Sequence, residues 1–71
     1  MNGTTDLSKR MYALADSGHE RAAELREKAD AFDVAAIGFY SEPQTVPVAK
    51  FMGAFARARR LWCDITGESL V

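Results

Sequence analysis

Apolar residues recur every three or four positions along most of the chain, which is the pattern of amphipathic helices. No run alternates with a period of two for long enough to predict a strand. The pattern therefore predicts an all-α fold. At 100° per residue, one set of apolar residues falls within an arc of about 100°: Leu7, Met11, Leu14, Ala22, Leu25, Ala29, Phe32, Ala36 and Phe39. A second set covers about half of a helical circumference: Val48, Phe51, Met52, Phe55, Ala58, Leu61, Trp62 and Ile65.

Two prolines and a glycine mark the ends of the longer helices. Pro43 and Pro47 disfavour helical geometry in the residues before them, and Pro47 suits the first turn of a new helix. Gly67 suits the position just past a helix end. We expect an antiparallel hairpin of helices at about 18–40 and 46–66. Pairing residues outward from the loop predicts its layers: Phe39 beside Val48, Ala36 beside Phe51, Phe32 beside Phe55 and Leu25 beside Trp62.

The segment Asp16-Ser17-Gly18-His19-Glu20 leaves two interpretations open. Asp-Ser-Gly is a turn signal, and Ser17 with Glu20 has the spacing of a capping box. Both favour a separate short helix at about 6–16 that folds back on the hairpin. The apolar stripe keeps its phase across the segment, however, and one glycine costs only about 1 kcal/mol within a helix. One continuous helix over 6–40 is therefore the alternative. We expect the break, because a continuous helix would leave the first apolar residues uncovered.

The chain is short enough to form one small domain over 1–71, with mobile tails expected at 1–5 and 68–71. A domain of this size buries only about 60% of the surface that its unfolded chain exposes. Small folds therefore often rely on disulfides, a metal or oligomerisation. With one cysteine and one histidine, the chain has no internal disulfide and no zinc site built from Cys and His alone. We expect the bundle to be completed by dimerisation or by a larger protein partner.

The charge is small overall and unevenly distributed. A net charge of −1 argues against bulk attraction to nucleic acid or to an anionic membrane. Residues 1–42 carry eight acids and five bases, whereas residues 43–71 carry four bases and two acids. No window approaches the roughly 18 apolar residues of a membrane span, and no apolar run follows the first basic residues. With a lone cysteine, which is typical of reducing compartments, these features predict a cytoplasmic protein without membrane partners.

The end of the second predicted helix is apolar on almost every side. Such a helix is covered on every side, either by the N-terminal segment or by another protein. In the second case its aromatic residues would be the anchors of the contact. The residues predicted to form this partner or dimer interface are Val34, Ile37, Phe39, Tyr40 and Leu61.

Three arginines near the end of the chain divide between two environments. Arg57 and Arg60 point to solvent with Lys50, and these three are the contact residues of an alternative, nucleic-acid-binding function. Nucleic acid is a less favoured partner, because the rest of the chain is acidic. Arg59 falls at the edge of the apolar stripe, where a guanidinium extends to solvent or pairs with a carboxylate. In the hairpin register its candidate partners are Glu27, Asp30 and Asp33.

Catalytic chemistry has little support in the sequence. Cys63 would need a base to act as a nucleophile, and His19 is the only histidine. No phosphate-binding glycine loop, nucleophile motif or Glu–His metal spacing is present. We therefore predict no enzyme, no cofactor and no metal. A thiol- or ligand-binding role remains a second alternative, built on these two residues or on the aromatic cluster Phe32, Phe51, Phe55 and Trp62.

The function favoured by the sequence is that of a small non-enzymatic protein–protein interaction module. Surplus apolar helix surface, a thin core and the lack of a catalytic motif all favour it. Such a protein would act as a regulator, an inhibitor or an accessory subunit of a larger cytosolic partner, through its helical surfaces.

Overall fold

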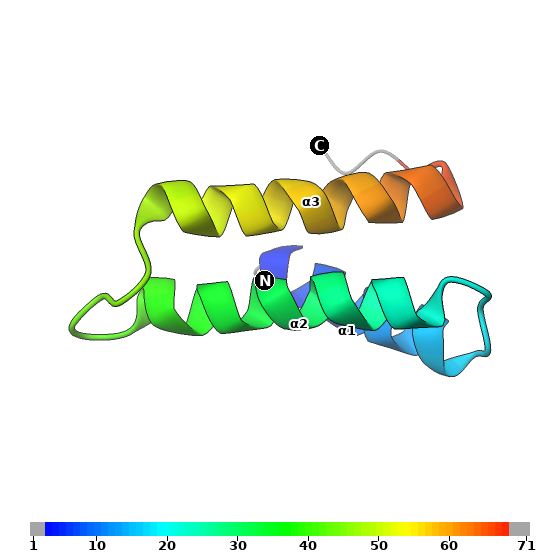
Figure 1. Ribbon diagram of the computed structural model, residues 1–71, viewed down its shortest axis with the longest axis horizontal. Coiled ribbons are helices and arrows are strands. Elements are labelled where there is room, and N and C mark those ends of the chain that lie inside the picture. Colours follow the sequence, from blue (N-terminus) through cyan, green and yellow to red (C-terminus); the bar gives the residue numbers. More distant parts are fainter. Residues whose placement is uncertain (1–2, 69–71) are drawn as a thin grey trace.

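The computed structural model describes residues 3–68, with side chains from Leu7 onward, and these residues form three helices and no strand. Helix α1 spans Gly3–Asp16, α2 spans Ala22–Tyr40 and α3 spans Val48–Thr66 (Figure 1). The all-α hairpin and the separate N-terminal helix are confirmed. Of the predicted tails, residues 1–2 and 69–71 lie outside the described residues, and the first tail contributes residues 3–5 to α1.

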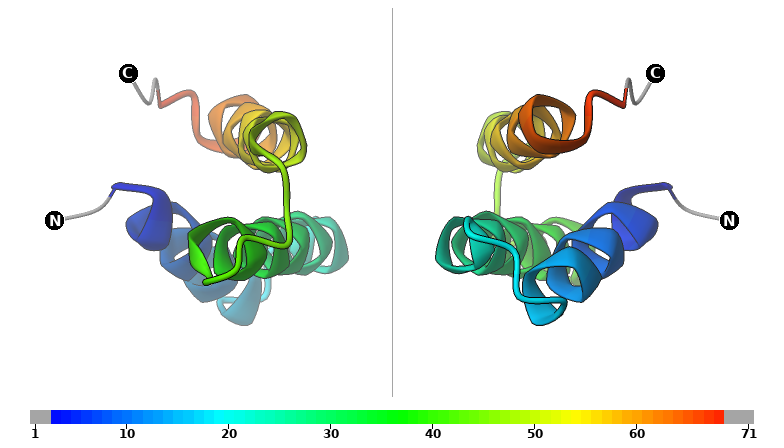
Figure 2. Two further views of the ribbon diagram at one scale, coloured as in Figure 1. Left: turned by 90° about the vertical axis from the view of Figure 1, so that its left-hand side faces the viewer. Right: turned by 90° about the vertical axis from the view of Figure 1, so that its right-hand side faces the viewer.

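Helices α2 and α3 run antiparallel, and α1 folds back along α2 (Figure 1). Seen end-on, the three helices occupy the corners of a triangle, and α1 contacts α2 much more than it contacts α3 (Figure 2). At 1.5 Å per residue, α1 is about 21 Å long and each of the other two about 28 Å. The N-terminal end of α1 lies near the middle of α2 and α3 (Figure 1). The half of the hairpin next to the α2–α3 loop is therefore not covered by α1.

The end of α1 is made by Ser17 and Gly18. The Ser17 hydroxyl donates a hydrogen bond to the Leu14 carbonyl at 2.6 Å, a contact that satisfies one of the free carbonyls at a helix end. Gly18 has φ 90°, a left-handed conformation that glycine adopts most readily. The predicted capping box from Ser17 to Glu20 is therefore not formed, because the hydroxyl serves the preceding helix instead of the following one.

Helix α2 begins at Ala22, four residues later than predicted, and His19 contributes to its start. The backbone N–H of Arg21 donates to His19 Nδ1 at 3.0 Å. One turn further, Arg21 Nε lies 2.8 Å from Glu24 Oε1. This hydrogen bond lowers the pKa of Glu24 and favours its negative charge near the N-terminus of the helix. The imidazole thus bonds the residue just before the helix, and no side chain caps the first turn of α2.

The α2–α3 loop folds against the last turn of α2 at Gly38. The Gly38 carbonyl accepts the backbone N–H groups of Thr45 at 3.0 Å and Val46 at 3.3 Å. It also accepts the Ser41 hydroxyl at 2.9 Å. Pro47, expected inside the helix, is instead its N-cap in an extended conformation, so that α3 starts two residues later than predicted. Thr45 and Val46 thus form backbone hydrogen bonds with Gly38 of α2 and do not belong to α3.

Replacing Gly38 by alanine is expected to destabilise the chain by about 1–2 kcal/mol. A Cβ at this position would collide with the Val46 side chain and lie 2.8 Å from Thr45 Oγ1, and overpacking typically costs about 1–3 kcal/mol. The gain in helix propensity, about 1 kcal/mol, offsets only part of this cost. Urea unfolding followed by tryptophan fluorescence measures the change.

Gly53→Ala is the matched control for this substitution. Its new Cβ would meet only the flexible Arg57 guanidinium, at 3.4 Å, so the propensity gain should leave this variant as stable as the parent or slightly more stable. If Gly38→Ala and Gly53→Ala had the same free energy of unfolding, the loop packing described here would be contradicted.

The core is formed by one row of side chains from each helix. The ring centroid of Phe32 lies 5.4 Å from that of Phe55 and 5.9 Å from that of Phe51, which confirms the predicted layer of Phe32 and Phe55. Phe39, predicted beside Val48, stacks on Phe51 with centroids 4.4 Å apart. The buried apolar residues are Leu7, Met11, Ala15, Leu25, Ala29, Phe32, Ala35, Phe51, Ala54, Ala58, Leu61 and Trp62.

Helix α3 ends at the predicted position. Gly67 has φ 71°, and its N–H donates to the Cys63 carbonyl at 2.8 Å, which closes the last turn. None of the helices in the described part of the chain is both long enough and apolar enough to cross a membrane.

Candidate interaction surface

Tyr12 of α1 shows which side of α2 faces α1. Burial, followed by the negative charges of Asp33 and Asp30, raises the pKa of Tyr12, so both carboxylates lie near α1. Tyr40 follows Asp33 by seven residues, which is about two helical turns. Tyr40 therefore projects toward the same side of α2, beyond the N-terminal end of α1. Tyr40 is consequently exposed although it lies in line with residues that α1 covers.

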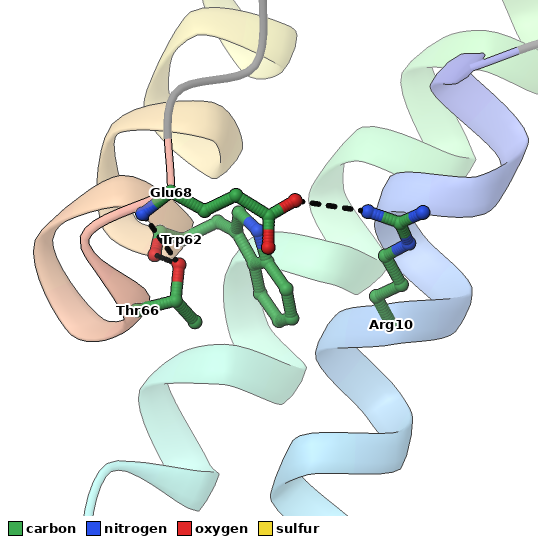
Figure 3. Close-up of polar contacts among 4 residues, drawn as sticks. All are labelled: Arg10, Trp62, Thr66 and Glu68. Atoms are coloured by element: carbon green, nitrogen blue, oxygen red, sulfur yellow. Dashed lines mark hydrogen bonds and ion pairs between the residues drawn. The ribbon is translucent and has the colours of Figure 1, made fainter.

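Trp62 shows in the same way which side of α3 faces α1. Figure 3 shows the indole of Trp62 beside the ion pair that joins Arg10 of α1 to the end of α3. Phe55 precedes Trp62 by seven residues, and Val48 precedes Phe55 by seven, so all three project toward the α1 side of α3. Burial along this row falls with distance from α1: Trp62 is buried, Phe55 is half-buried and Val48 is exposed.

Ile37 precedes Tyr40 by three residues and Met52 follows Val48 by four, so each lies beside that residue on the surface of its helix. Together these side chains form an apolar surface that we call the open-end face. Within the described part of the chain, four of the five exposed large hydrophobic side chains belong to it, with exposed fractions of 52% to 72%. Its members are Ile37, Phe39, Tyr40, Val48, Met52 and Phe55.

The open-end face rests on a layer of packed aromatic rings. Tyr40 makes edge-to-face contacts with Phe39 and Phe51, with centroids 4.9 and 5.7 Å apart. Such arrangements are favoured geometries for aromatic pairs. Contacts with the rings of Phe39 and Phe51 therefore order the exposed ring of Tyr40. An anchor that is already ordered loses little side-chain entropy when a partner binds.

The residues predicted for a partner interface lie in different parts of the molecule. Ile37 and Tyr40 are exposed on the open-end face, and Phe39 is half-buried within it. Leu61 is only 5% exposed and packs in the core, so it offers no surface to a partner. Val34 is 60% exposed, but it precedes Tyr40 by six residues and projects about 120° away around α2. Of the residues predicted for the interface, Ile37, Phe39 and Tyr40, which lie next to the α2–α3 loop, belong to the open-end face.

Arg59 lies at the edge of the open-end face. Its guanidinium carbon is 5.8 Å from the centroid of the Phe55 ring, within the range of a cation–π contact. Among the side chains that the structure describes, no carboxylate forms an ion pair with it. Asp30 and Asp33 lie near Tyr12 instead, and Glu27 pairs with Lys28 at 3.4 Å. The ion pair expected from the hairpin register is therefore not made within the described residues.

The three residues of the predicted nucleic-acid surface lie on the opposite side of α3. Lys50, Arg57 and Arg60 are exposed, and none of them has an ion-pair partner among the described side chains. Asp64 follows Arg60 by four residues and therefore projects to the same side. The basic stripe is short and ends at an acidic residue.

The Arg10–Glu68 ion pair joins α1 to the end of α3 (Figure 3) and had no signal in the sequence pattern. Arg10 Nη1 lies 3.1 Å from Glu68 Oε1. The Thr66 hydroxyl donates to the Trp62 carbonyl at 2.8 Å and accepts the Glu68 N–H at 3.1 Å. The indole Nε1 of Trp62 is buried without a hydrogen-bond partner in the described structure. Because both charges are about half exposed, the pair contributes little stability.

Cys63 lies in α3, and His19 lies in the turn between α1 and α2. Cys63 is a half-buried free thiol, and no hydrogen bond joins it to His19, whose Nδ1 accepts the Arg21 N–H. No group of three or more His, Cys, Asp or Glu side chains that could hold a metal ion occurs between Leu7 and Glu68. In the proposed ligand cluster, the Phe32 ring packs against the rings of Phe51 and Phe55.

Comparison with protein-family models, with curated proteins and with solved structures gives no match for this chain. The open-end face holds four of the five exposed large hydrophobic side chains of the described surface. Single exposed hydrophobic residues are common on soluble proteins, whereas grouped ones mark interaction sites.

Proposed function

We propose that this chain is a small non-enzymatic interaction module that binds a protein partner through the open-end face. The observation that carries the proposal is the grouping of Ile37, Tyr40, Val48 and Met52 at the end of the bundle that α1 leaves uncovered. Burying side chains of this kind contributes about 1.5–3 kcal/mol each. Aromatic residues and methionine are also enriched in interfaces. In this role the chain would act in the cytoplasm as a regulator, an inhibitor or an accessory subunit.

The charged side of α3 gives weaker support to a nucleic-acid function. Binding to phosphates favours a continuous basic surface, and here Asp64 interrupts the side that carries Lys50, Arg57 and Arg60. The chain as a whole carries a net charge of −1. A protein partner is therefore the function that we propose.

A double variant, Ile37→Ser with Met52→Ser, is expected to weaken association with the partner at least ten-fold. Both side chains are exposed, so their replacement removes apolar contact area with little effect on folding. Association is measured by sedimentation of the purified chain and by affinity capture from an extract of the native host, quantified by mass spectrometry. Circular dichroism checks that the variant remains helical.

Val34→Ser is the matched control, because Val34 is also large, apolar and exposed on α2 but projects about 120° away from Tyr40 around that helix. It should associate like the parent. Equal association by the double variant and the parent would refute the proposed role of the open-end face.

A further inference from the structure

We draw no further inference here: the strongest candidate, the apolar surface patch that the open-end face forms beside the α2–α3 loop, is exposed, and nothing in the part of the chain that the structure describes shows what covers it.

Discussion

Replacing Phe32 by alanine should remove about 3–5 kcal/mol of stability. Phe32 is 1% exposed and lies between α2 and α3, with its ring against those of Phe51 and Phe55. At about 0.05–0.15 kcal/mol per residue, a chain of this length has roughly 4–11 kcal/mol of stability in all. The substitution should therefore remove between about a quarter and all of that stability, and the urea concentration at the midpoint of unfolding should fall clearly. The free energy of unfolding is obtained from urea titrations read by far-UV circular dichroism.

Val34→Ala is the control for this experiment, since Val34 lies two residues away on the same helix and is 60% exposed. It should change the free energy of unfolding by no more than about 0.5 kcal/mol. Equal effects of the two substitutions would show that Phe32 does not lie in the core.

Replacing Met11 by alanine should cost about 2–5 kcal/mol, and it tests whether α1 folds back on the hairpin. Met11 is 0% exposed in this structure. In the alternative of one helix over 6–40, Met11 would extend past the end of the hairpin into solvent, and its replacement would have little effect on stability. The loss of stability therefore distinguishes the two chain paths. The single tryptophan, Trp62, is buried beside the ion pair that Arg10 of α1 makes with Glu68 (Figure 3) and is a suitable fluorescence probe.

Lys9→Ala is the control for Met11, because Lys9 is exposed on the same helix. Its effect should stay within about 0.5 kcal/mol. If the Met11 and Lys9 variants unfolded at the same urea concentration, the position of α1 on α2 would be contradicted.

The helix ends show where local chemistry is sufficient for prediction and where it is not. The end of α3 was predicted correctly because glycine adopts a left-handed conformation without strain, and Gly67 has no competing role. The start of α2 was predicted four residues too early. Ser17 had two local options, and its hydroxyl bonds the Leu14 carbonyl of the preceding helix. Two hydrogen bonds of similar strength compete at this point, and the residue pattern does not distinguish them.

The candidate site depended on contacts between distant residues. The sequence indicated a surplus of apolar residues at the end of α2, but Leu61 was assigned to the interface and belongs to the core. The open-end face is exposed because the N-terminal end of α1 lies near the middle of the hairpin. The hydrophobic periodicity of α2 and α3 gives no information about the length or the tilt of α1. Arg59 shows the same dependence, since none of the three carboxylates expected beside it forms an ion pair with it in the described part of the chain.

The sequence by itself therefore determined the helices, their order and the hairpin, because hydrophobic spacing, prolines and glycines act over a few residues. It left the path of the chain at Gly18 open, since the apolar stripe keeps the same phase in a broken and in an unbroken helix. The tertiary structure decided that path, and with it which apolar side chains are covered and which remain exposed at the open end. Burial is a property of the packed helices, so it depends on neighbours that lie far away in the sequence.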